Sequence, residues 1–174
     1  MQNLGHNLSK ALLIALLSIG GASASAIANA SPNQTTPSFV RTPPHEFPKP
    51  TDTEVVALAD HSIRVFMTSV RGKSMQTFWK HVSLQLQKKY SVAKLDAAFK
   101  EFYGLPISGN PLAGLSPIFK SRPVIDENRK LVVEGYYTTR PSQLNFRLVY
   151  LKEGLSWKVI GINVKVNPKT APST

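Results

Sequence analysis

The sequence predicts an α+β domain in which three N-terminal helices pack on a curved, four-stranded antiparallel sheet. Between Thr51 and Gly104 apolar residues recur every three or four positions, the period of a helix with one buried face. After Gly104 they alternate with polar residues instead, as in half-buried strands. Because the two patterns are segregated along the chain, they favour an α+β fold over a parallel sheet with helical crossovers.

The first thirty residues have the composition of a secretory signal peptide. Lys10 is their only charged side chain, an apolar run follows over 11–20, and Ala28-Asn29-Ala30 supplies an A-x-A ending. The apolar run is shorter than the roughly 20 residues of a membrane-spanning helix. We therefore expect cleavage near Ala30–Ser31, a periplasmic or secreted protein, and no transmembrane span after cleavage.

Residues 31–50 hold six prolines in twenty positions and few large apolar side chains. Such a segment buries too little surface to offset the entropy of ordering, so we expect an extended, disordered linker. Docking of this proline-rich segment on aromatic side chains is the alternative interpretation. The folded domain is then expected over 51–167, with a disordered tail over 168–174.

The chain carries 21 basic and 10 acidic residues, a formal net charge of +11. Export argues against nucleic acid and favours anionic lipid, acidic polysaccharide or an acidic protein as the partner. The basic residues are spread along the chain, so a solvated basic surface is the alternative to a dedicated anion-binding face. Cysteine is absent, which excludes a disulfide, a thiolate metal site and a cysteine nucleophile.

The three expected helices have recognisable starts. Thr51 and Glu54 have the spacing of a capping box, ahead of a helix over about 52–70. Ser74 is expected to cap a second helix and Ser91 a third.

Four strands are expected after the helices, near 117–125, over 130–139, over 144–150, and over 155–166. In the third, Leu144, Phe146, Leu148 and Tyr150 alternate with residues of the opposite face. Glu153-Gly154 is predicted to close a tight hairpin between the last two. The apolar positions of the last strand change parity around Val159–Ile160, which predicts a bulge or bend near Gly161.

The run KLVVEGYYTTRPSQLNFRLVYLKEGLSWKVIGINV ends in a Tyr-x-x-Glu-Gly-x-x-Trp-Lys pattern formed by Tyr150, Glu153, Gly154, Trp157 and Lys158. With the split helical lead, it resembles small exported bacterial members of the nuclear-transport-factor-2-like superfamily over residues 52–166. The resemblance implies a cone-shaped fold that encloses a pocket, and pairing through the sheet as one route to a homodimer. That superfamily includes isomerases, dehydratases, ligand carriers and partner-binding domains, so the resemblance does not select a function.

Glu134 and Tyr136 are the candidate catalytic residues, because they share one face of their strand. If that face looks into the cone, Glu134 is a carboxylate with a raised pKa beside a phenol, suited to act as a general base. In the alternative interpretation the opposite face, with Tyr137, meets the core and Glu134 is solvated or paired with a neighbouring arginine. Arg147 is then either a cross-strand partner or an anion hook at the pocket mouth.

The sequence predicts no metal and no cofactor. His45 lies in the linker, and His61 and His81 lie on different helices without an H-x-x-x-H pair. The G-x-S-x-G, P-loop and G-x-G-x-x-G motifs are absent, so neither nucleophilic hydrolysis nor nucleotide binding is supported.

We therefore expect a non-enzymatic exported domain that binds a small apolar or amphipathic molecule, or an envelope protein, through its pocket or sheet face. The residues expected to line the pocket are Phe66, Phe78, Trp79, Phe102, Tyr136, Phe146, Tyr150 and Arg147. One alternative is an isomerase or dehydratase with Glu134 as base. The other is a basic interaction module that attaches to anionic envelope polymers or to a protein complex.

Overall fold

The computed structural model describes residues 49–105, 109–140 and 142–168. The predicted signal peptide, most of the predicted linker and nearly all of the predicted tail lie outside the described residues. Within the described part, no helix combines the length and the apolar character needed to cross a membrane.

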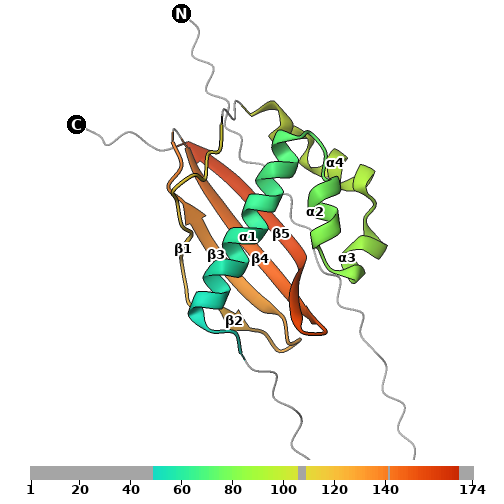
Figure 1. The fold of residues 1–174 in the computed structure, drawn as a ribbon, viewed down its shortest axis with the longest axis vertical. Helices are drawn as coiled ribbons and strands as arrows, with labels where there is room; N and C mark the ends of the chain where they lie inside the picture. Colours follow the sequence, from blue (N-terminus) through green and yellow to red (C-terminus); the bar gives the residue numbers. More distant parts are fainter. Residues whose placement is uncertain (1–48, 106–108, 141, 169–174) are drawn as a thin grey trace, which may run out of the picture. The chain divides into compact units, whose positions relative to one another are not determined.

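The described chain is α+β, with helices in its first half and an antiparallel sheet in its second (Figure 1). The helices are α1 (Asp52–Arg71), α2 (Gln76–His81), α3 (Leu84–Lys89) and α4 (Val92–Phe99), followed by the 3-10 helix η1 (Lys100–Gly104). The strands are β1 (Ile118–Phe119), β2 (Val124–Ile125), β3 (Leu131–Tyr137), β4 (Ser142–Glu153) and β5 (Ser156–Pro168). The strand order is β1-β3-β4-β5, and β2 also pairs with β3. The predicted α+β class is confirmed.

α1 begins at the predicted capping box. Thr51 Oγ1 accepts a hydrogen bond from the Glu54 backbone N at 3.3 Å, and Glu54 Oε2 accepts one from the Thr51 backbone N at 2.7 Å. The helix lies over one face of the sheet (Figure 1). Its buried residues are Val55, Ala59, Ser62, Ile63, Phe66, Met67, Ser69 and Val70.

The prediction of a single second helix is wrong, because the chain breaks at Val82–Ser83 into α2 and α3. Val82 pairs with Val159 of β5 in a parallel bridge, and the Ser83 N–H donates to the Val159 carbonyl at 2.8 Å. Ser83 Oγ then accepts from the Leu86 N–H at 3.1 Å and so caps α3. The contact with the edge of the sheet therefore interrupts the helix between α2 and α3. The short helices α2, α3 and α4 lie beside β5 (Figure 1).

The start of α2 is held both by Ser74, whose Oγ accepts a hydrogen bond from the Gln76 N–H at 3.3 Å, and by a carboxylate of α4. The Met75 N–H donates to Asp96 Oδ1 at 2.6 Å, and the Tyr103 hydroxyl donates to the same oxygen at 2.6 Å. Ser91 caps α4 as predicted, since its side chain accepts a backbone N–H of the first turn. Asp96, a carboxylate distant in the sequence, therefore adds to the hydrogen bond that Ser74 makes locally.

The strand predicted near 117–125 is instead two short strands on the same edge of β3. Phe119 pairs with Gly135 and Val124 with Val132, so the four residues 120–123 face only two residues of β3. The chain therefore leaves the ladder between β1 and β2.

The β4–β5 hairpin and the bulge in β5 are confirmed. Glu153 pairs with Ser156 across a two-residue turn, whose Gly154 has a φ of 58°. Farther along, Val149 pairs with Gly161 and Tyr150 with Val159, which leaves Ile160 as the extra residue.

The space between α1 and the sheet is filled by the main hydrophobic core. Burial along β3 alternates strictly, so one face of that strand meets the core and the other faces away. At Gly135, on the inner face, an added Cβ would lie 2.6 Å from the Ile118 carbonyl oxygen and 2.7 Å from Phe146 Cζ. Only glycine therefore fits where β1, β3 and the Phe146 ring meet.

Candidate functional site

The structure distributes the predicted pocket residues over three environments. Phe66, Phe78, Phe146 and Tyr150 are buried in the main core, and Trp79 and Phe102 are partly buried against it. Tyr136 and Arg147 belong to the face of the sheet that points away from the core. Phe66 is in edge-to-face contact with Phe78 and Phe102, with ring centroids 5.6 and 5.7 Å apart. These three rings are brought together as core packing.

Glu134 and Arg147 face each other on that outer face of the sheet. They are directly opposite in register, and Arg147 Nε lies 2.8 Å from Glu134 Oε1. Their side chains are 44% and 51% exposed, so the pair is worth no more than about 1 kcal/mol. Of the two arrangements left open by the sequence, the structure has the cross-strand ion pair. The enzymatic alternative required Glu134 in an apolar pocket, and this environment does not supply one.

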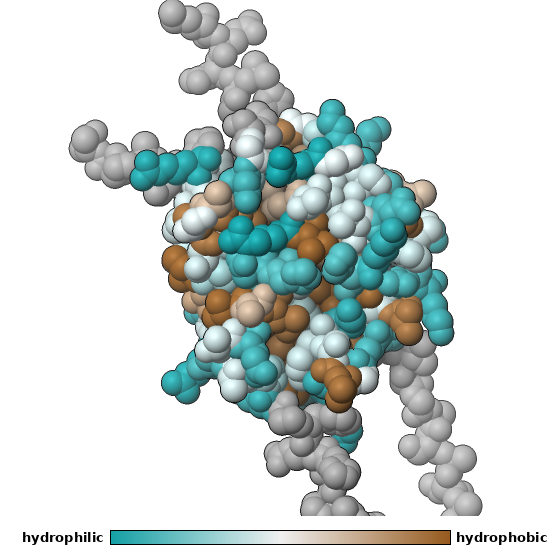
Figure 2. All heavy atoms as spheres, in the orientation of Figure 1, coloured by the Kyte–Doolittle hydropathy of each residue, from teal (hydrophilic) through white to brown (hydrophobic). Residues whose placement is uncertain are grey.

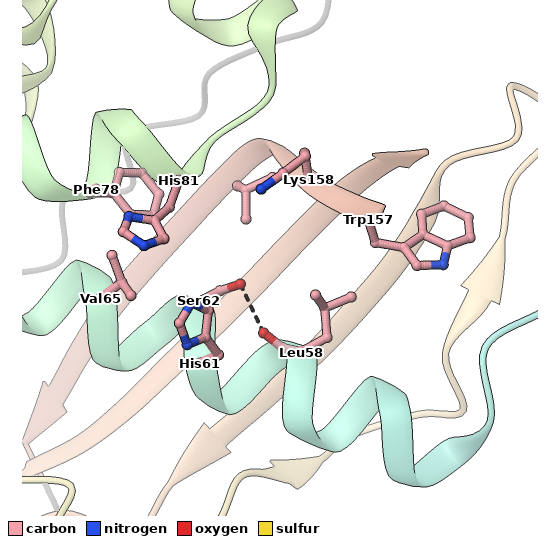
Figure 3. A pocket seen from close by; sticks show the side chains of 9 residues that line it. Leu58, His61, Ser62, Val65, Phe78, His81, Trp157 and Lys158 are labelled. Atoms are coloured by element: carbon pink, nitrogen blue, oxygen red, sulfur yellow. Dashed lines mark hydrogen bonds between the residues drawn. The ribbon is translucent and has the colours of Figure 1, made fainter. Parts of the chain in front are cut away.

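A hollow of about 60 Å³ opens between α1, α2 and β5 (Figure 3). Its lining residues are Leu58, His61, Ser62, Val65, Phe78, His81, Trp157, Lys158 and Val159. Phe78 is the member of this lining that the sequence had pointed to. Pockets that enclose a drug-sized ligand measure about 300–1,000 Å³, so this hollow accommodates a small chemical group rather than a whole molecule.

Two imidazoles stand together at this hollow. His61 of α1 and His81 of α2 approach one another, with ring centroids 5.6 Å apart and planes tilted by 58° (Figure 3). His81 Nδ1 lies 2.8 Å from the Thr77 carbonyl oxygen. Because a carbonyl only accepts, Nδ1 carries the hydrogen, and Nε2 remains available to bind a proton or a donor.

Lys158 brings an amino group to the same hollow from β5 (Figure 3). Its side chain is partly buried, and no carboxylate of the described residues forms a salt bridge with it. Trp157, Lys158 and Val159 all line the hollow although neighbours in a regular strand point to opposite faces. Their pairing with β4 is regular, and the extra residue of the bulge, Ile160, follows directly after them.

The polar groups at the floor of the hollow are already hydrogen-bonded. The Ser62 hydroxyl donates to the Leu58 carbonyl at 2.8 Å and accepts from the Tyr150 hydroxyl at 3.0 Å. Burial raises the pKa of Tyr150 well above its ordinary value, which keeps this phenol neutral. Since the Ser62 proton is engaged by a carbonyl, the serine is not arranged as a base-activated nucleophile.

The arrangement is suited to bind an anion. Its lining contains two imidazoles and one ammonium group, and none of its nine residues is acidic. A zinc site needs three or four convergent ligands, and the described residues contain no group of three or more His, Cys, Asp or Glu that could hold a metal. The sequence did not indicate this site, because no spacing rule brings together side chains from α1, α2 and β5.

No family model, curated protein or solved structure matches this chain. Fold and site together define an α+β domain with a small cationic hollow where its helices meet the edge strand of the sheet. The likeness to the nuclear-transport-factor-2-like superfamily rests on the sequence pattern alone.

Proposed function

We propose that this protein is an exported, non-enzymatic binding domain that holds the anionic end of an amphipathic molecule in the hollow of His61, His81 and Lys158. The observation that carries the proposal is the convergence of three basic side chains on a hollow whose lining has no carboxylate. Export is part of the proposal on the basis of the N-terminal sequence pattern. A cone-shaped fold of the nuclear-transport-factor-2-like kind is part of it on the basis of the resemblance.

The dimensions favour a carboxylate or phosphate as the bound group. A hollow of about 60 Å³ is too small for an apolar tail, so the tail of the ligand would lie outside it. Leu58, Val65 and Trp157 supply apolar surface around the charged groups for the start of such a tail. Charge-assisted hydrogen bonds from Lys158 and protonated imidazoles would supply the specificity for an anion.

Binding of dodecyl phosphate tests the proposal, with dodecyltrimethylammonium as the cationic counterpart of equal chain length. Lys158→Gln, and separately the double change His61→Gln with His81→Gln, should weaken dodecyl phosphate binding about tenfold, since a hydrogen bond to a charged group contributes about 1.5–3 kcal/mol. The matched control is Lys165→Gln, an exposed lysine farther along β5, which should bind as the parent does. Equal affinity for the cationic amphiphile, or unchanged affinity in both site variants, would refute the proposal.

A further inference from the structure

One continuous stretch of the helical half is basic without any compensating acid. From His61 to Leu95 the sequence contains no Asp or Glu. Its seven basic residues are Arg64, Arg71, Lys73, Lys80, Lys88, Lys89 and Lys94. All of them except Arg64 are exposed, and the stretch includes the whole of α2 and α3. α2 and α3 therefore carry basic and no acidic side chains of their own, and Glu153 of β4 is the carboxylate that contacts the start of α3.

Two strongly exposed leucines lie beside this basic surface. Leu84, the first residue of α3, is 63% exposed, and Leu155 at the tip of the β4–β5 hairpin is 98% exposed. The Leu84 N–H donates to both carboxylate oxygens of Glu153, at 3.0 and 3.2 Å, which holds the start of α3 against the hairpin. Figure 2 shows hydrophobic side chains interrupting a largely hydrophilic surface near that end of the molecule.

The tip of the hairpin is built from a lysine, a tryptophan and the exposed leucine. Lys152 Nζ lies 5.4 Å from the centroid of the Trp157 ring and donates to the Leu155 carbonyl at 3.0 Å. Tryptophan and lysine side chains that combine an apolar body with a polar end are suited to the boundary between water and lipid. An exposed leucine beside a lysine and a tryptophan has the chemistry of a peripheral membrane contact.

We infer that α3 and the β4–β5 hairpin form a docking surface for an anionic lipid bilayer. Leu84 and Leu155 enter the headgroup region, while Lys88, Lys89 and Lys152 face the lipid phosphates. The leucines favour lipid over an acidic polysaccharide or nucleic acid, because neither of those polymers offers an acyl layer to receive them. The inference does not rest on the proposed function, since it uses none of the residues His61, His81 or Lys158.

Binding of the full chain to lipid vesicles measures the electrostatic contribution of the lysines to membrane docking. The two vesicle types are phosphatidylcholine alone and equal parts of phosphatidylcholine and phosphatidylglycerol. Lys88→Gln with Lys89→Gln should reduce the partition onto the anionic vesicles about 25-fold at low salt, since each juxtamembrane lysine contributes about fivefold. The control is Lys120→Gln with Arg122→Gln, two exposed cations between β1 and β2. It should keep the partition of the parent.

Insertion of the hairpin tip into the bilayer is measured with a fluorescent label on an introduced cysteine. The chain has no native cysteine, so only the introduced one is labelled. Leu155→Cys and, as matched control, Val124→Cys each carry an environment-sensitive fluorophore; Val124 is 58% exposed on β2. The label at position 155 should brighten and shift to the blue on the anionic vesicles, whereas the label at position 124 should not. Leu155→Ser should reduce the partition about tenfold, as expected for one withdrawn leucine side chain.

The inference is overturned if the label at position 155 stays in water on vesicles that bind the chain. It is equally overturned if the change at Lys88 and Lys89 and the change at Lys120 and Arg122 alter the partition alike. Heparin and double-stranded DNA are included as soluble polyanions. If they compete fully with the vesicles and Leu155→Ser has no effect, the surface is a general polyanion site and not a lipid-docking surface.

Discussion

Asp60 on α1 and Tyr137 at the end of β3 are joined by a hydrogen bond of 2.9 Å across 77 positions of sequence. The other carboxylate oxygen of Asp60 accepts from Arg64 Nε at 2.7 Å. Arg64 in turn donates to the carbonyl oxygens of Leu112 and Leu115, at 3.0 and 2.8 Å. This chain of bonds ties the sheet, the long helix and the loop before β1 together.

Tyr137→Phe should destabilise the protein by about 1.5–3 kcal/mol, because it removes a hydrogen bond to a charged group and leaves the Asp60 carboxylate short of a donor. Urea unfolding followed by circular dichroism measures the change. Tyr136→Phe on the outer face is the matched control and should stay within about 0.5 kcal/mol of the parent. Equal effects of the two changes would show that the Asp60 bond contributes nothing to stability.

The folded protein should lose stability as the pH rises above about 10, the ordinary pKa of tyrosine. Burial and the hydrogen bond to Asp60 raise the pKa of Tyr137, burial and Asp96 raise that of Tyr103, and burial raises that of Tyr150. The unfolded chain releases these protons near pH 10 while the folded chain still holds them. Stability is therefore fully present below that pH and falls above it.

Denaturant unfolding at a series of alkaline pH values, together with tyrosinate absorbance, measures this dependence. Tyr137→Phe should make the loss of stability with pH shallower, because one of the three phenols no longer ionises on unfolding. Ionisation of all five tyrosines near the ordinary pKa in a chain that stays folded would contradict the prediction.

Gly135→Ala should cost about 1–3 kcal/mol, the usual cost of forcing an extra methyl group into a packed core. The new Cβ would meet the Ile118 carbonyl at 2.6 Å, and backbone cannot move aside as a side chain can. Gly104→Ala is the control, because nothing lies within 4 Å of a Cβ added there. A comparison of the two free energies of unfolding tests the close approach of β1 to β3.

Glu153→Gln should weaken the attachment of α3 to the hairpin by about 1 kcal/mol, a typical value for a side chain that caps a helix start. The Leu84 amide should then exchange its hydrogen faster, because its N–H loses the carboxylate that accepts it. Hydrogen exchange followed by NMR reads this amide directly. Glu127→Gln, in an exposed turn, provides a variant of equal charge change that should leave the Leu84 amide as it is.

Features that depend on neighbouring residues could be predicted from the sequence. The Thr51–Glu54 capping box, the Gly154 turn and the bulge at Ile160 each follow from a local pattern of a few residues. The class of the fold follows in the same way, because helical and strand periods are properties of short windows.

Features that depend on a distant partner could not be predicted. The break between α2 and α3 requires the Val159 carbonyl, and the hydrogen bond from the Met75 N–H requires Asp96 of α4. The sequence did not determine which face of β3 carries Glu134. In the structure Glu134 lies on the outer face, where it pairs with Arg147.

The order of amino acids alone therefore determined the α+β class, the helix starts and the final hairpin of this protein. The tertiary structure decided where the second helix breaks, which face of β3 is buried, and that His61, His81 and Lys158 share a hollow. The reason is physical: periodicity, capping and turn preference act over a few residues along the chain. Hydrogen bonds to a sheet edge and the convergence of charged side chains exist only once remote segments have packed together.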